Sequence, residues 1–253
     1  DKNTLVVTTS VSGNTIETLT VLDSAHKLDC NLIAFFSGGK MEEFCTKNQI
    51  NYKKIEMIHS PRTSFIKFTF SIMNVLNSIL PIDKNHIVES IGALSKLQKN
   101  ICSQSLSDSN PSLSLANFIS EIPLIYYPYG LQSSAIRFKS SMQENAKTHA
   151  ITEDIVEACH NGIVAWEKPS IIQPILLRGY DDYIKTQERF EIIKEFFTKN
   201  NIEFKEINSV SGNILTKLIT LTYLLDYASI YRAILSGIDP TPVSSITFVK
   251  SKM

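Results

Sequence analysis

The sequence has few of the residues that build metal centres or disulfide frameworks. Its 253 residues include four cysteines and five histidines. The cysteines (Cys30, Cys45, Cys102 and Cys159) lie far apart and form no Cys-x-x-Cys pair. Because the histidines are equally scattered, the sequence predicts no metal site. Reduced thiols in a cytoplasmic protein are the default interpretation. No bound cofactor is expected.

Charge imbalance and long apolar runs are also lacking. The chain carries 25 basic and 25 acidic residues, so its formal net charge is zero, and no basic stripe is present. Nucleic acid is therefore not an expected partner. No uninterrupted apolar run reaches the roughly 18 residues that a membrane span needs, and no signal peptide is visible, so no membrane association is expected either.

What the sequence does contain is typical of a globular α/β protein. Hydrophobic residues make up 43% of the chain and charged residues 20%. Apolar strand-like runs alternate with helical patterns, which favours doubly wound parallel sheets flanked by helices. Strands are expected at 5–8, 32–36, 52–57, 122–127, 171–177 and 203–207. Helices are expected at 16–27, 41–48, after Pro61, and at 85–104, 131–147, 181–200 and 215–235.

The segment from Ser105 to Ser112 has the composition of a linker. It divides the chain into a first α/β domain with a trailing helix (1–104), a linker (105–112), and a second α/β domain with a C-terminal helix and tail (113–253). The strand at 5–8 is interpreted as central, and a buried parallel strand needs neighbours on both sides. We therefore expect the first domain to lack an N-terminal part.

A hydroxyl-rich loop joins the first expected strand to the first expected helix. It contains Ser10, Ser12, Gly13 and Thr15. The first N–H groups of a helix have no partner within the helix, and the helix dipole places partial positive charge there. Together with three hydroxyls, this arrangement is typical of a phosphate site. An ordinary turn with a helix cap is the alternative. A second Ser-Gly-Asn, at 211–213, has fewer hydroxyls and is interpreted as a helix start.

The second half holds two groups suited to proton transfer, Glu144 and His160. A carboxylate and an imidazole can both move protons near neutral pH. Taken alone, Glu144 is interpreted as a solvated acid at a helix end, and His160 as a cap or core residue. Arg62, at the start of a helix, could hold an anion or face solvent. By default, Lys250 is a solubilising charge.

These motifs together resemble a known family. Ser-x-Ser-Gly-Asn-Thr-x-Glu-Thr after a strand resembles the phosphate loop of sugar isomerase (SIS) domains. Glu144-Asn145-Ala146-Lys147, His160-Asn161 and an Asp239-Pro240-Thr241-Pro242 turn with a late lysine narrow the resemblance. In this order they resemble the archaeal-type bifunctional phosphoglucose/phosphomannose isomerases, over the whole chain.

The resemblance implies a fold, an assembly and a substrate. The fold is two SIS domains, each a doubly wound parallel sheet, assembled as a homodimer without a metal ion. The substrate is a sugar phosphate, and Ser10, Ser12 and Thr15 match the hydroxyls that hold its phosphate.

It also implies catalytic roles. Glu144 matches the base that moves a proton between C1 and C2, and Arg62 matches the arginine that stabilises the enediolate. His160 matches the residue that assists ring opening and reaches the site from the partner subunit. Lys250 matches the lysine that works with that histidine.

The sequence departs from the family pattern at two points. The family's Gly-Gly-Ser-Gly loop, whose serine also contacts phosphate, is absent. Val243 stands where bifunctional members can carry a hydroxyl residue associated with the mannose activity. Two other functions remain open: a regulator that binds sugar phosphates without converting them, and an isomerase that acts on an amino-sugar phosphate.

Overall fold

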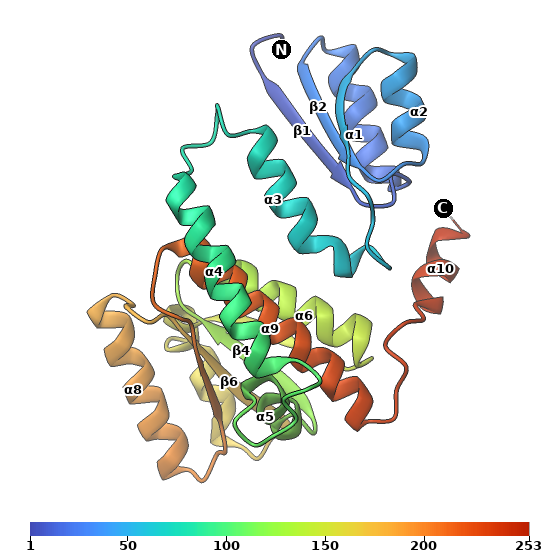
Figure 1. Cartoon of the computed structure of the whole chain (residues 1–253). Helices are drawn as coiled ribbons and strands as arrows, with labels where there is room; N and C mark the ends of the chain where they lie inside the picture. Colours follow the sequence, from blue (N-terminus) through green and yellow to red (C-terminus); the bar gives the residue numbers. More distant parts are fainter. Residues whose placement is uncertain (253) are drawn as a thin grey trace. The chain divides into compact units, whose positions relative to one another are not determined.

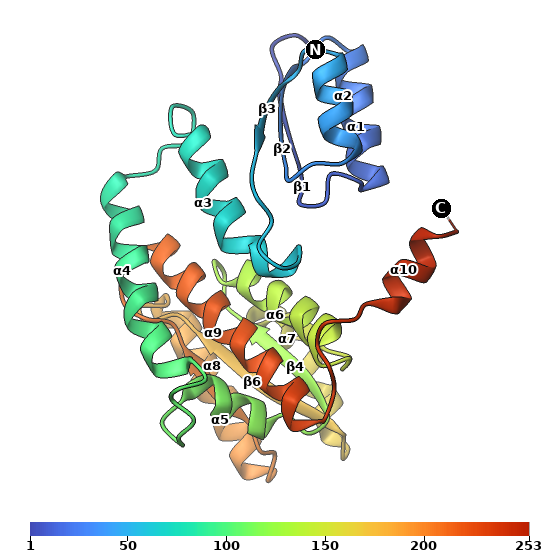
Figure 2. The same cartoon turned by 45° about the vertical axis from the view of Figure 1, so that its right-hand side comes forward.

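The computed structural model describes residues 1–252 and contains two compact units (Figures 1 and 2). The first unit is Asp1–Ile82, and the second begins at Asp83. Each unit is an α/β structure with one parallel sheet flanked by helices, as the alternation of apolar runs predicts.

The first unit has a three-stranded parallel sheet with the strand order β1-β2-β3. Its helices cover both faces of the sheet, because successive strand residues point to opposite sides. Ala34 and Phe36 pack with α1 and α2, whereas Phe35 packs with α3. The elements are β1 (Leu5–Ser10), α1 (Ile16–Lys27), β2 (Asn31–Phe36), α2 (Lys40–Lys47), β3 (Asn51–Lys54), the 3₁₀ turn η1 (Arg62–Ser64) and α3 (Phe65–Val75).

Strand β1 is not central within the described sheet. It lies at the edge and pairs with β2 alone among the described strands, and Leu5 and Val7 are 39% and 40% exposed. The described residues thus supply one neighbour for β1, and they do not test the expectation that it has neighbours on both sides.

The second unit has a four-stranded parallel sheet with the order β5-β4-β6-β7. Helices α5, α6 and α9 pack on the face that carries Ile125 and Ile175. Helices α7 and α8 pack on the face of Tyr126 and Leu176. The elements are α4 (Lys84–Ile101), α5 (Pro111–Phe118), β4 (Ile122–Tyr127), α6 (Gln132–Asn145), β5 (Ile151–Asp154), α7 (Ile155–Ala158), the 3₁₀ turn η2 (Gly162–Glu167), β6 (Ile172–Arg178), α8 (Ile184–Lys199), β7 (Lys205–Asn208), α9 (Ile214–Leu235) and α10 (Ser244–Lys250).

The structure divides the chain at 82/83 rather than in the expected linker at 105–112. Helix α4 belongs to the second unit because it lies along α9 (Figures 1 and 2), where the Tyr231 hydroxyl donates to the Ile101 carbonyl at 2.6 Å. Residues 105–112 lead into α5, whose N-cap is Asn110. The Asn110 side chain accepts hydrogen bonds from the backbone of Ser112 and Leu113 at 3.0 Å each. The serine, asparagine and proline that gave this segment the composition of a linker are thus residues typical of a helix N-terminus.

Helix α9 has the length and composition of a membrane span, with a mean hydropathy of 1.2 over its most apolar window. It is the central core helix of the second unit, since α4, α5 and α6 all pack against it. Its apolar composition is thus accounted for by packing within the unit.

The second Ser-Gly-Asn is the start of α9, as expected. The Asn213 side chain caps the helix by accepting a hydrogen bond from the Thr216 backbone at 3.0 Å. Glu89 of α4 accepts from the Asn213 N–H at 3.1 Å, and hydrogen bonds from Asn213 lower the pKa of this carboxyl. The exposed Glu89 carboxylate therefore faces the N-terminus of α9 and ties it to α4.

Candidate functional site

The three residues predicted to bind phosphate lie along the connection from β1 to α1. The Ser10 and Thr15 hydroxyls are 2.8 Å apart. The Ser10 hydroxyl also accepts from the Gly13 N–H at 3.1 Å, and the Ser12 hydroxyl accepts from the Asn14 N–H at 3.3 Å. Thr15 is the N-cap residue of α1 but makes no side-chain cap to it. The loop therefore places hydroxyl groups near the N-terminus of α1. The first N–H groups of this helix receive no cap from the Thr15 side chain, and such groups can bind an anion.

A second turn, at Gly38 and Gly39, supports this loop from behind. The Met41 N–H donates to the Gly13 carbonyl at 2.9 Å, and the Lys40 N–H donates to the Asn14 side chain at 3.0 Å. Gly13 has a φ of +68°, and a Cβ built on it would lie 1.7 Å from the Gly38 carbonyl oxygen. A glycine is thus required at position 13, because any side chain would overlap the backbone of the second turn.

Arg62 begins the 3₁₀ turn η1 in the same unit, directly after Pro61. The turn is fixed by the buried Ser64, whose hydroxyl accepts from the Ile58 N–H at 2.8 Å and lies 3.0 Å from the Ser60 carbonyl. Arg62 is therefore partly exposed on a rigid turn rather than on a loose loop.

In the second unit, Glu144 lines a cavity of about 550 Å³ near the end of α6. One wall comes from α6 and the residues after it, including Ser140, Glu144 and Lys147. The opposite wall is the chain from Pro242 to Ile246, which contains Val243. The sequence motif and the C-terminal turn thus meet at one cavity of a size usual for small-molecule sites.

Several polar side-chain contacts hold α6 against α9 and thereby fix the position of Glu144. Arg137 makes a bidentate pair with Asp226, with Nε–Oδ1 and Nη2–Oδ2 distances of 3.1 and 2.9 Å. The Asn145 amide donates to the Ser229 hydroxyl at 2.8 Å, and both side chains are buried. Sequence reasoning missed this anchoring role of Asn145, because its partner lies far along the chain.

His160 and Lys250 do not line the Glu144 cavity as its described residues define it. His160 is exposed in the turn after α7, where its N–H donates to the Glu157 carbonyl at 2.9 Å. The Glu153 carboxylate packs against Gly162 in the same turn. Burial raises the pKa of the Glu153 carboxyl, and the negative charge of Glu157 raises it further. Lys250 is the exposed last residue of α10, which follows an extended segment leaving α9 (Figures 1 and 2).

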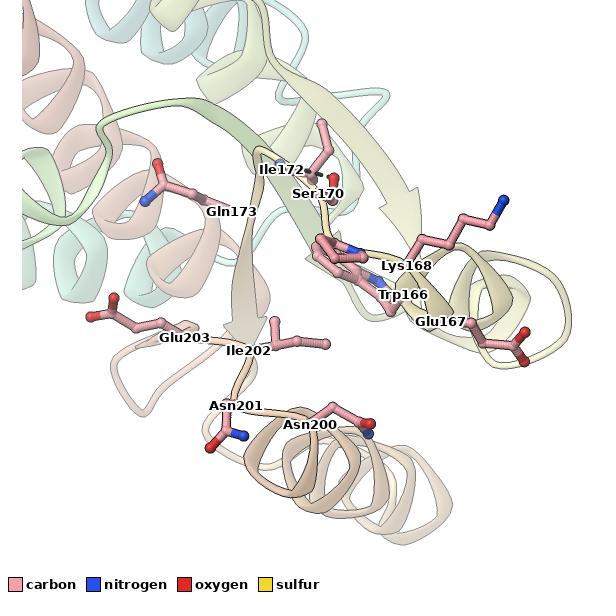
Figure 3. Close-up of a pocket in the computed structure, with 11 residues that line it drawn as sticks. Trp166, Glu167, Lys168, Ser170, Ile172, Gln173, Asn200, Asn201, Ile202 and Glu203 are labelled. Carbon is pink, nitrogen blue, oxygen red and sulfur yellow. Dashed lines mark hydrogen bonds between the residues drawn. The ribbon is translucent and has the colours of Figure 1, made fainter.

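A different cavity, of about 500 Å³, lies at the amino ends of β6 and β7 and contains none of the predicted site residues (Figure 3). Trp166, Gln173 and Asn201 are among the residues around it. The Gln173 side chain is already engaged, since it accepts from Ser120 and Glu121 and donates to the Phe118 carbonyl. Over residues 1–252, no group of three or more His, Cys, Asp or Glu side chains is placed to hold a metal ion.

The known proteins that this chain resembles have names that refer to sugar phosphates. Residues 108–253 match the family model of the bacterial phospho-glucose isomerase C-terminal SIS domain. The bifunctional phosphoglucose/phosphomannose isomerase of Caldicellulosiruptor bescii is 31% identical over all of this chain and 77% of its own length. The D-glucosamine-6-phosphate 4-epimerase of Sulfolobus acidocaldarius is 32% identical over 64% of this chain and 51% of its own.

The fold has a solved counterpart in a glucose-6-phosphate isomerase-like protein from Thermus thermophilus. The two share a TM-score of 0.65 at 14% identity, over 94% of this chain and 82% of that one, so this likeness concerns the fold alone. The family model and the full-length relative carry the assignment: the chain belongs to the family of bifunctional phosphoglucose/phosphomannose isomerases and is an enzyme of the isomerase class.

Proposed function

We propose that this enzyme interconverts glucose 6-phosphate, and also mannose 6-phosphate, with fructose 6-phosphate. The observation that carries the proposal is the carboxylate-bearing cavity at Glu144, in a chain that belongs to this family. Both C2 epimers lose their C2 proton to the same planar enediolate, so one base can serve both sugars. A coupled assay with each of the two aldose phosphates tests the proposal, and a purified, folded protein that converts neither contradicts it.

In this mechanism Glu144 takes the C2 proton and returns it at C1, while the proton of the O2 hydroxyl passes to O1, so that C2 becomes the carbonyl carbon. The intermediate is a cis-enediolate, and its negative charge requires a preorganised cation, the role we assign to Arg62. His160, assisted by Lys250, moves a proton between the ring oxygen and the anomeric hydroxyl to open the sugar ring. None of these steps requires a metal ion or a cofactor.

The β1–α1 loop is proposed to bind the phosphate through Ser10, Ser12 and Thr15. The phosphate is remote from the reacting carbons, so its binding energy serves to orient them. The loop suits this role because its hydroxyls and the α1 N-terminus all favour an anion.

Ser12→Ala is expected to weaken substrate binding without removing a reacting group. A hydrogen bond to a charged group contributes about 1.5–3 kcal/mol, so KM should rise roughly 10- to 100-fold, with a smaller change in kcat. Steady-state kinetics measure both constants. Ser24→Ala, on the exposed side of α1, is the matched control and should leave KM unchanged. An unaltered KM in Ser12→Ala would remove the loop from the phosphate site.

We further propose a cytoplasmic homodimer in which His160 serves the substrate of the partner subunit. Glu144→Gln and His160→Ala proteins should each be inactive alone, yet regain activity when they are mixed and allowed to exchange subunits. A mixed dimer holds one site with both substitutions and one with neither, so a random mixture should recover about a quarter of wild-type activity. Absence of recovery in a mixture shown to contain mixed dimers would contradict the shared site.

The proposal extends to the fold and to metabolism. Each unit is proposed to be an SIS domain, with residues 1–82 forming one and the C-terminal unit the other. Interconversion of these hexose phosphates would place the enzyme in glycolysis and gluconeogenesis.

An activity on amino-sugar phosphates is a second candidate. It is favoured by the similarity to the D-glucosamine-6-phosphate 4-epimerase of Sulfolobus acidocaldarius. Comparing kcat/KM for glucose 6-phosphate and glucosamine 6-phosphate separates the two candidates, because an enzyme built for one should use the other far less efficiently.

A further inference from the structure

Lys147 has a backbone conformation that is unusual for a lysine. It follows the end of α6 with a φ of +55°, in the left-handed region. Glycine or asparagine usually fills such a position after a helix, because a Cβ there crowds the following carbonyl. A lysine at this position is therefore unfavourable for the backbone, which directs attention to what its side chain does.

The Lys147 ammonium lies among three backbone carbonyl oxygens. It donates to Glu144 O at 2.5 Å, to Pro242 O at 2.7 Å and to Pro240 O at 3.5 Å. An ammonium has three N–H donors and no acceptor, so these contacts match its capacity. The Asp239 side chain accepts from the Thr241 N–H at 2.8 Å in the same turn. Hydrogen bonds from Thr241 lower the pKa of the Asp239 carboxyl, and the charge of Lys147 adds to this lowering.

These contacts join the two walls of the Glu144 cavity. One acceptor is the carbonyl of Glu144 itself. Of the other two, Pro240 lies in the turn before the opposite wall, and Pro242 is the first residue of that wall, Pro242–Ile246. The two prolines, Pro240 and Pro242, each have a fixed φ, so a bond to this turn also constrains the direction of the chain beyond it. One ammonium thus ties the end of α6 to the segment that faces the Glu144 side chain.

We propose that Lys147 is a positioning residue, whose ammonium holds the wall formed by residues 242–246 in place across the cavity from Glu144. The inference rests on the proposed role of Glu144 in proton transfer. Lys147 itself need not contact the sugar. Its contribution is to keep the cavity closed around a substrate in one geometry, and a displacement of about 1 Å in such a site can cost about 100-fold in rate.

The test separates the ammonium from the backbone conformation. Lys147→Gly removes the ammonium and relieves the left-handed backbone, whereas Lys147→Met removes the ammonium and keeps the unfavourable conformation. Lys147→Arg keeps a cation with several donors. Lys185→Met, an exposed lysine paired with Glu188 on α8, is the matched control.

Two measurements are needed, and the first uses protein without substrate. Hydrogen–deuterium exchange of residues 241–250 should become faster in Lys147→Gly and Lys147→Met, and remain near the wild-type rate in Lys147→Arg and Lys185→Met. In the coupled assay, kcat should fall at least about tenfold in both ammonium-free variants, with a smaller change in KM, and partly recover in Lys147→Arg.

The two measurements distinguish a failure of the Lys147 proposal from a failure of the proposed isomerase activity. If the wild-type protein converts no hexose phosphate but exchange at 241–250 responds as stated, the proposed function fails and the tie between the walls stands. Unchanged exchange in Lys147→Gly overturns the tie. If Lys147→Gly keeps wild-type kcat while Lys147→Met loses both stability and kcat, the residue matters only for folding, and the proposal is wrong.

Discussion

Glu144→Gln is expected to lower kcat by about 10²- to 10⁴-fold while the protein still binds sugar phosphate. The amide has nearly the same shape as the carboxylate and can still form hydrogen bonds, but it cannot accept the C2 proton. Since Glu144 lines the cavity at the end of α6, the substitution removes the proposed base without altering the backbone that positions it. A coupled assay measures kcat, and calorimetric titration with fructose 6-phosphate measures binding.

The control for this prediction is Glu195→Gln on α8. Glu195 pairs with Lys199 at 2.5 Å on an exposed helix face and lines none of the described cavities. It should keep wild-type kcat. If Glu144→Gln retains turnover near that of the wild-type enzyme, Glu144 is not the base. If it loses both turnover and binding, its part is to hold the substrate rather than to transfer a proton.

Much of the fold follows from local patterns in the sequence. The helix at 16–27 and the strand at 122–127 have the predicted bounds, because both combine a clear apolar period with well-marked ends. The apolar patterns do not predict helix α5, although Asn110-Pro111 is a cap followed by proline at the first helical position. They do not predict strand β5 either, because its four residues are exposed or half-buried and form no apolar run.

The limits of prediction at the candidate site follow from sequence separation. The hydroxyls of Ser10 and Thr15 meet because these residues flank one short loop, which also contains Ser12. Glu144 and Val243 line the same cavity because the segment after α9 passes the end of α6. The path of that segment cannot be predicted from a local apolar period. The assignment of α4 to the first domain is wrong for the same reason, since its apolar face is matched by α9 and not by its neighbours in sequence.

Gly13→Ala is expected to disable phosphate binding more severely than the loss of a single hydroxyl. The left-handed backbone alone costs an L-residue about 1–2 kcal/mol. The added methyl group would also lie 1.7 Å from the Gly38 carbonyl oxygen, and this obstacle is backbone, which cannot rotate away as a side chain can. The loop must therefore move, and the Gly13 contacts with Ser10 and Met41 must break or lengthen.

Displacing the loop moves all of its hydroxyls and the α1 N-terminus together. KM should then rise beyond the roughly 10- to 100-fold expected of Ser12→Ala, because several charge-assisted contacts are lost at once. The thermal unfolding midpoint should fall as well, since the strain is stored in the folded state. Steady-state kinetics and a thermal melt measure the two effects.

Gly38→Ala provides the matched control, because Gly38 lies in the very turn that the methyl group of Gly13→Ala would strike. The φ of Gly38 is not in the left-handed region, and a Cβ there would meet only the Glu42 side chain at 3.5 Å, an ordinary contact. Its KM should stay within about twofold of wild type, because neither strain nor overlap arises. Equal effects of the two substitutions would mean that the glycine turn as a whole is sensitive. Wild-type KM in Gly13→Ala would show that phosphate binding does not depend on this loop.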